Sequence, residues 1–129
     1  MVRIICIGNR FYYPDNFGIE IYEALIKNSY ENIEVVEGGV GGMNLALYFE
    51  DDAEILLVDL GIDQKKILTQ DDIKAMKIDE FDHATALLYL LKTVEKNFTI
   101  YLCNEAYKKD EIEIYKNEIL DLVRSLACK

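Results

Sequence analysis

The sequence predicts an α/β fold, a three-layer α/β/α sandwich around a mostly parallel central sheet of about five strands. Two observations lead to this prediction. Short apolar runs alternate along the chain with segments whose apolar residues recur at helical spacing. The runs are apolar almost throughout, which is typical of parallel strands covered by helices on both faces. With 129 residues and 51% hydrophobic content, the chain can build one sizeable core, so we expect a single domain over residues 1–129.

The chain begins with a predicted strand, a loop and a helix. Residues 2–7 are apolar and rich in β-branched side chains, and the run stops at Gly8, which indicates a buried strand followed by a turn. From Phe17 onward apolar residues recur at helical spacing, which predicts a helix of about three turns. Either Asp15 or Asn16 can cap the first turn of this helix.

The middle of the chain repeats the order of strand, turn and helix. Residues 33–37 form a second predicted strand, and the glycine-rich turn at 38–42 leads into a segment with helical periodicity at 43–49. A third strand is predicted over 54–60, where a continuous apolar run is closed by Asp59.

The last part of the chain contains two more strands and two more helices. A short strand is predicted near 66–68. Residues 84–96 carry an apolar stripe at helical spacing, and Asp82 is placed to cap the first turn. Residues 98–103 form another buried strand, and a closing helix follows over 110–127 with acidic residues near its start.

Charge and apolar patterning exclude several classes of protein. The 14 basic residues face 24 acidic ones, and the net charge of −10 would repel a nucleic acid backbone, so we expect no nucleic acid partner. No apolar run approaches the roughly 20 residues of a membrane span, and the first one is too short for a secretory signal. We therefore expect a soluble, cytoplasmic protein without a membrane partner.

The three cysteines suit an intracellular protein as well. Cys6, Cys103 and Cys128 are odd in number and widely separated along the chain. This pattern favours reduced thiols in the core over disulfides or a structural zinc site.

Candidate functional residues follow the predicted strands. In an open α/β sheet, ligands bind where the strands end at their carboxyl termini. Asp15 lies in the loop after the first strand, Glu37 ends the second and Asp59 ends the third. His83, the only histidine, stands at the start of the predicted helix over 84–96.

Two common kinds of site do not fit these residues. The turn after the first strand lacks the G-x-G-x-x-G pattern of dinucleotide sites, and the glycine-rich turn at 38–42 lacks the lysine and hydroxyl of a phosphate loop. Nucleophilic catalysis needs a serine, cysteine or threonine paired with a base. Neither Ser29 nor Ser125 lies at a sharp turn between a strand and a helix, and His83 has no evident partner among them.

A divalent metal ion fits the remaining residues. Asp15, Asp59 and His83 would supply three ligands and leave coordination positions open for water or substrate. A mixture of carboxylate and imidazole suits zinc, nickel, iron or manganese. Each residue also has a simpler interpretation, as a helix cap, a strand-end turn residue or a solvated residue at a helix start. The residue types alone leave both interpretations open.

Four segments, in this order and context, resemble the nickel–iron hydrogenase maturation endopeptidases. The first is Ile7-Gly8-Asn9 followed by Pro14-Asp15-Asn16-Phe17-Gly18 at a helix start. The others are an acidic residue with a glycine-rich loop at 37–45, a strand ending in aspartate at 56–59, and the histidine-led helix that begins with Asp82-His83-Ala84-Thr85. The similarity covers nearly the whole chain.

The resemblance implies a cytoplasmic endopeptidase that removes a short C-terminal extension from the precursor of a hydrogenase large subunit after nickel insertion. The substrate would supply the nickel, for which zinc or cadmium could substitute in vitro. By position in the family motifs, Asp15, Asp59 and His83 would contact the metal, and Glu37, which leads the glycine-rich loop, is associated with substrate recognition. In the mechanism that we expect, a nearby carboxylate such as Glu37 is available to accept a proton from an attacking water. The neighbouring glycines would bind substrate: Gly38, Gly39, Gly41 and Gly42. We expect a monomer.

This sequence also departs from the family pattern. Asp15 stands where the family has glutamate, and Asn16-Phe17 replaces smaller residues. Two other functions therefore stay open: a non-catalytic partner in hydrogenase assembly on the same scaffold, and a small domain that binds a nucleotide or flavin.

Overall fold

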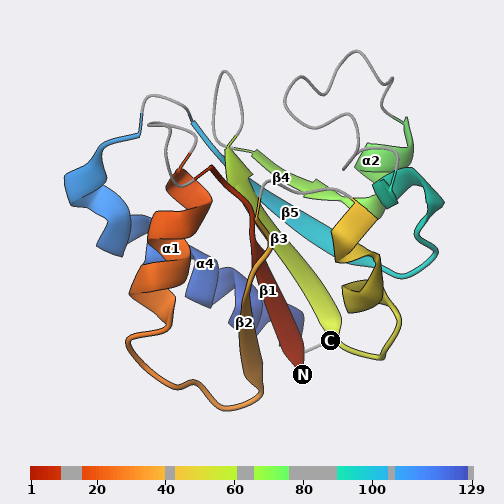
Figure 1. Cartoon of the computed structure of the whole chain (residues 1–129), viewed down its shortest axis with the longest axis horizontal. Coiled ribbons are helices and arrows are strands. Elements are labelled where there is room, and N and C mark those ends of the chain that lie inside the picture. Colours follow the sequence, from red (N-terminus) through yellow and green to blue (C-terminus); the bar gives the residue numbers. More distant parts are fainter. Residues whose placement is uncertain (10–15, 40–42, 61–65, 76–89, 105–106, 128–129) are drawn as a thin grey trace.

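A five-stranded sheet lies at the centre of the molecule, with helices on both of its faces (Figure 1). The computed structural model describes residues 1–9, 16–39, 43–60, 66–75, 90–104 and 107–127. The strand order is β2-β1-β3-β5-β4. The first four strands of that order are parallel, and β4 at the edge is antiparallel to β5. The predicted fold class is confirmed.

The strands are formed by the apolar runs that the sequence indicates. Their bounds are Val2–Cys6 for β1, Ile33–Glu37 for β2, Glu54–Leu60 for β3, Lys66–Thr69 for β4 and Phe98–Cys103 for β5. The three central strands, β1, β3 and β5, are almost fully buried, because helices cover both of their faces.

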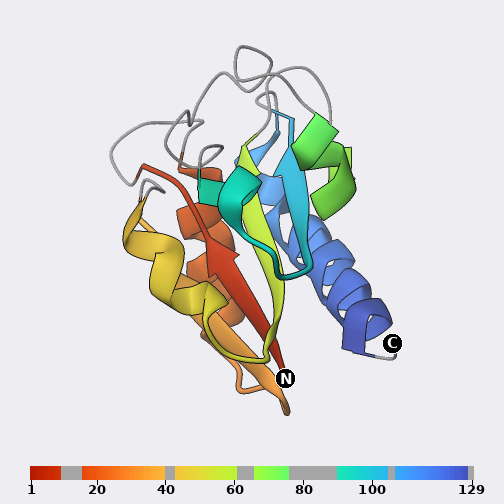
Figure 2. The ribbon, with the colours of Figure 1, turned by 90° about the vertical axis from the view of Figure 1, so that its right-hand side faces the viewer.

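Two long helices cover one face of the sheet, and shorter elements cover the other. α1 (Phe17–Leu25) and α4 (Ile112–Ala127) contribute to one buried cluster with alternate residues of the strands. The opposite cluster takes side chains from the 3-10 helix η1 (Met43–Phe49), from α2 (Gln70–Ala75) and from a helical turn over residues 90–93. Figure 2 shows the sheet between η1 and α4. A further 3-10 turn, η3 (Lys109–Glu111), leads into α4.

Several helical segments differ from the prediction. Residues 43–49 form a 3-10 helix, in which positions three apart lie on one side, so that Tyr48 lies above buried Leu45 and both pack on the core. The predicted helix over 84–96 ends at Thr93 in the structure, and its first six residues lie outside the described part of the chain. The side-chain amide of Gln70 donates a hydrogen bond to the Val94 carbonyl at 2.9 Å, just beyond the end of this helix.

The sequence analysis missed α2. Its single buried residue, Ile73, gives no apolar periodicity. A local signal was present, because the backbone N–H of Thr69 donates to the Asp72 carboxylate at 2.8 Å, while the Asp72 N–H faces the Thr69 hydroxyl at 3.4 Å. This reciprocal arrangement is a capping box.

Two of the three cysteines lie in the core. Cys6 and Cys103 are buried free thiols, as expected, and Cys128 lies outside the described residues. Burial raises the pKa of the Cys6 thiol, and the negative charge of Glu37 raises it further.

In the described ranges, no helix is both long and apolar enough to cross a bilayer.

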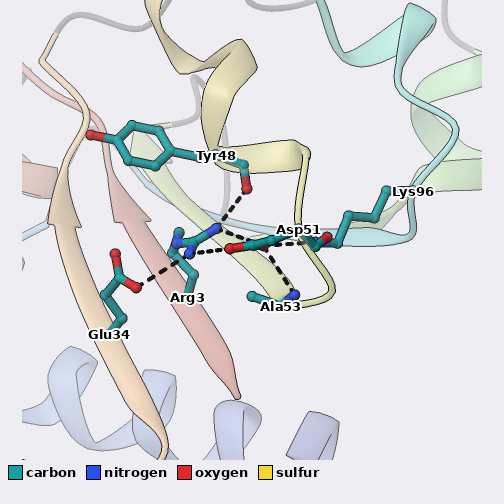
Figure 3. Close-up of polar contacts among 6 residues, drawn as sticks. All are labelled: Arg3, Glu34, Tyr48, Asp51, Ala53 and Lys96. Carbon is teal, nitrogen blue, oxygen red and sulfur yellow. Dashed lines mark hydrogen bonds and ion pairs between the residues drawn. The ribbon is translucent and has the colours of Figure 1, made fainter.

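The buried guanidinium of Arg3 links β1 to β2 and to the segment before β3, near the amino-terminal ends of these strands (Figure 3). Arg3 on β1 is only 6% exposed and forms a two-pronged ion pair with Asp51, at 3.0 and 2.7 Å. Its guanidinium also donates to the Tyr48 carbonyl at 2.8 Å and contacts the Glu34 carboxylate at 3.3 Å. Lys96 reaches Asp51 as well. The cluster therefore fixes the segment between η1 and β3.

We expect this ion pair to make folding stability depend on pH in acid. The Arg3 hydrogen bonds and the Ala53 N–H hold the pKa of Asp51 below its usual range. A depressed carboxyl pKa contributes stability above the unfolded-state value of about 3.9, and this is lost as the pH falls toward the folded-state pKa. Urea midpoints from pH 6 to pH 2 should therefore fall less steeply for Asp51→Asn than for the wild type. Asp121→Asn, at an exposed ion pair with Arg124, is the control. Equal slopes for wild type and Asp51→Asn would contradict the expectation.

Candidate functional site

The candidate site lies at the carboxyl ends of β1, β2 and β3. In the sheet register Cys6 lies level with Glu37 on β2 and with Val58 on β3. The three strands therefore end at nearly the same height, and the loops that follow them leave from one edge of the sheet. In Figure 1 this edge is opposite the N-terminus.

Asp59 is a buried carboxylate at this edge. It is 5% exposed, on the central strand β3. Side chains alternate along a strand, so Asp59 faces the same side as Leu57, toward η1. Its Oδ1 accepts the Leu60 N–H at 2.7 Å, which orients the carboxylate. Asp59 therefore presents an oriented carboxylate near the carboxyl end of β3.

Glu37 lies at the end of β2 and is exposed. By the same alternation it leaves the sheet on the α1 side, with Val35. β1 lies between β2 and β3, so the strands of Glu37 and Asp59 are about 10 Å apart. The two carboxylates thus start from opposite faces of the sheet, and the fold does not pair them directly.

Backbone hydrogen bonds of three glycines join the segments after β1 and β2. The Gly38 N–H donates to the Cys6 carbonyl at 2.7 Å, and the Gly8 N–H donates to the Gly39 carbonyl at 2.8 Å. A Cβ on Gly38 would lie 2.8 Å from a methyl carbon of Ile5, so no larger residue fits there without movement. Gly39 has a φ of 63°, a conformation that favours glycine.

The start of α1 is held against the end of β1. A Cβ on Gly18 would lie 2.0 Å from the carbonyl oxygen of Ile7, so the helix touches the backbone directly after β1. Asn16 precedes the helix, but its side chain makes no cap hydrogen bond, contrary to one of the two predicted caps. Its Oδ1 instead accepts from the Tyr107 hydroxyl at 3.0 Å, and its Nδ2 donates to Glu20 at 3.2 Å.

Tyr107 is a residue near the site that the sequence analysis missed. It is 2% exposed and follows β5, beyond Asn104. Its ring packs on Phe17 with centroids 4.8 Å apart. A tyrosine after a buried strand was the available signal, but its partner lies 91 positions away in the sequence.

The remaining predicted site residues, Asp15, His83, Gly41 and Gly42, lie outside the described residues. Within the described ranges, no group of three histidine, cysteine, aspartate or glutamate residues could hold a metal ion. The predicted set of three metal ligands therefore remains a prediction, and Asp59 is the one of the three that the structure describes. The set offers two carboxylates and an imidazole, which are donors that zinc and nickel accept.

Comparison with known proteins identifies the fold. No protein-family model matches the chain, and no curated protein matches its sequence. The solved structure of the hydrogenase maturating endopeptidase HybD from E. coli is similar, with a TM-score of 0.76 and 18% identity over 96% of this chain and 92% of that one.

Two structures of HycI are similar as well. The [NiFe] hydrogenase maturation protease HycI from Thermococcus kodakarensis KOD1 has a TM-score of 0.65 and 15% identity, over 99% of this chain and 92% of that one. The endopeptidase HycI from Escherichia coli has a TM-score of 0.63 and 21% identity, over 91% of this chain and 88% of that one. The predicted resemblance is thus confirmed at the level of structure: over nearly its whole length, this chain has the fold of the hydrogenase maturation endopeptidases.

Proposed function

We propose that the chain is an endopeptidase that removes the C-terminal extension of a [NiFe] hydrogenase large-subunit precursor after nickel insertion. The observation that carries the proposal is the buried carboxylate of Asp59 at the carboxyl edge of a sheet with the fold of HybD. Binding and catalytic residues of open α/β sheets gather at this edge.

Asp59 is suited to recognise a cation that arrives with the substrate. Its carboxylate is already desolvated and oriented by the Leu60 N–H. Little reorganisation is therefore needed when a cation binds, and the attraction is stronger in the protein than in water. Together with Asp15 and His83, Asp59 would bind the nickel held by the precursor, so that an empty precursor binds poorly.

The substrate nickel would polarise the scissile carbonyl or lower the pKa of an attacking water. Glu37, exposed at the same edge, would accept a proton from that water once the substrate is bound.

The glycine segment after β2 would bind the substrate chain. Gly38 is buried and Gly39 is exposed, so backbone groups rather than side chains face a bound peptide at this point. Backbone without a Cβ allows close approach of another chain. We extend this role to Gly41 and Gly42, which follow in the sequence, and we propose that the chain acts as a cytoplasmic monomer.

The test is incubation with a hydrogenase large-subunit precursor, prepared with and without nickel. We expect mass spectrometry to show loss of the C-terminal extension from the nickel-loaded precursor only. His83→Ala should leave that precursor at full length, because one of the three proposed ligands is removed. Full processing by His83→Ala would contradict the proposed ligand set. A precursor that binds wild-type protein but is never shortened would instead identify a non-catalytic assembly partner.

A further inference from the structure

β2 lies at one edge of the sheet, with β1 on its inner side (Figure 1). In a parallel sheet, successive residues of a strand direct their backbone groups alternately to one side and to the other. The Gly38 N–H donates to the Cys6 carbonyl at 2.7 Å, so the even-numbered residues along β2 face β1. Val35, in the middle of β2, therefore directs its N–H and C=O outward, away from β1.

This outer edge has the properties of a strand that can pair with another chain. In the part of the chain that the structure describes, no strand lies beyond β2. β2 contains neither lysine nor proline, the residues that commonly protect a free edge from pairing. Its Glu34 faces the η1 side of the sheet, where its carboxylate contacts Arg3 at 3.3 Å. An extended peptide can bind to an edge of this kind as one more strand.

A hollow of about 470 Å³ lies beside this edge, between β2 and the segment that follows α1. Ile33 and Val35 line it from β2, and Ile26, which is 52% exposed, lines it from the other side. Side chains of directly opposed strand residues lie on the same face of a sheet. Alternate side chains of an added strand would therefore enter the hollow and cover the apolar surface of these three residues.

Lys27 gives the hollow a positive charge. Lys27 is exposed, and it is the charged residue among the described residues that line the hollow. Asn28 and Ser29, beside it, add an amide and a hydroxyl that can donate hydrogen bonds. This end of the hollow therefore suits a carboxylate, such as the C-terminus of a peptide.

The outer edge of β2 also leads directly away from the proposed substrate site. β2 ends at Glu37, next to the glycine segment that we propose binds the substrate chain. A chain that leaves this segment along the outer edge runs antiparallel to β2. The five residues of β2 span about 16 Å, so about six further residues would bring such a chain to the hollow beside Lys27.

We propose that the C-terminal extension of the precursor binds as an added antiparallel strand along β2, with its terminal carboxylate at Lys27. The inference rests on the proposed function, and it names the surface that holds the segment to be removed. These contacts lie away from the scissile bond and are the same before and during cleavage. They therefore act on KM rather than on kcat.

Amide hydrogen exchange of the wild type tests the pairing without any cleavage. The probe is a synthetic peptide with the sequence of the extension of the precursor in the processing experiment, with a free C-terminal carboxylate. At saturating peptide, we expect exchange of the Val35 N–H to slow at least about 10-fold, because this group becomes a donor to the added strand. The Val36 N–H is the internal control, since it already faces β1 and should change little.

Two substitutions test the edge and the cation separately. Val35→Pro removes the outward N–H and keeps the pairing with β1, so KM on nickel-loaded precursor should rise about 5- to 10-fold at an unchanged kcat. Lys27→Met should bind the free-acid peptide and its C-terminal amide equally, whereas the wild type should prefer the free acid by about 3-fold. Lys74→Met, at an exposed lysine of α2 on the other face of the sheet, should keep that preference. Thermal midpoints show whether each variant folds, and Lys27→Met and the exchange experiment serve if Val35→Pro does not.

The outcomes separate this inference from the proposed function. If the wild type shortens the precursor while the peptide leaves Val35 exchange unchanged, the extension does not bind along β2 and the proposed function stands. If the wild type never shortens the precursor, the proposed function is wrong, and Val35 exchange alone decides whether the edge binds the extension. Equal wild-type affinity for the acid and the amide would contradict the place given to the terminal carboxylate. Val35 protection that grows with protein concentration, without peptide, would show that a second copy covers the edge, and would overturn the inference.

Discussion

Asp59→Asn should reduce processing of a nickel-loaded precursor more than about 100-fold, while the protein stays folded. The substitution keeps the volume and an oxygen that accepts the Leu60 N–H, but it removes the buried negative charge. Loss of a partner that merely supports a metal ligand costs 10- to 100-fold, so loss of a ligand charge should cost more. Because asparagine has nearly the same volume as aspartate, the packing around position 59 is kept.

The measurements are initial rates of precursor shortening and urea midpoints. Glu54→Gln is the control, since it makes the same loss of charge on the same strand at the opposite end. We expect Glu54→Gln to process at nearly the wild-type rate. If Asp59→Asn also retains wild-type activity, Asp59 does not act on the metal.

Gly18→Ala should destabilise the protein by about 3 kcal/mol or more, as severe overpacking does. The added Cβ would lie 2.0 Å from the Ile7 carbonyl oxygen, which belongs to the backbone directly after β1 and cannot move aside alone. Within a helix, glycine to alanine is ordinarily stabilising by about 0.5–1 kcal/mol. A loss of stability would therefore report the close contact between α1 and β1.

Urea denaturation measures this effect, and Gly39→Ala provides the comparison. Gly39 has open space around its Cα but a φ of 63°, so alanine there should cost only about 1–2 kcal/mol from backbone strain. A Gly18→Ala variant as stable as the wild type would show that the helix can shift away from Ile7 at little cost.

The sheet was predictable because each strand is marked locally. The bounds of β2, β3 and β5 agree with the predicted ranges. β3 and β5 are buried strands, which appear as nearly continuous apolar runs, and the half-buried β2 is marked by β-branched residues before a glycine-rich turn. The shorter helical elements were less predictable. α2 buries one side chain and therefore gives no α-helical pattern. Residues 43–49 do show helical periodicity, but a segment this short does not distinguish an α-helix from the 3-10 helix η1 that forms there.

Contacts between distant segments could not be predicted from local patterns. Arg3 pairs with Asp51 across 48 positions, and Tyr107 meets Asn16 across 91. Each pair depends on how the sheet orders its strands rather than on neighbouring residues. The place of Asp59 was predictable from the strand that it closes, whereas its convergence with Asp15 and His83 remains a prediction.

That convergence is the central claim, and a crystal of the protein soaked with cadmium tests it most directly. We expect an anomalous difference peak at the carboxyl edge of the sheet, with the side chains of Asp15, Asp59 and His83 all within about 2.5 Å of the ion. Cadmium bound elsewhere, or an imidazole of His83 directed away from Asp59, would contradict the account.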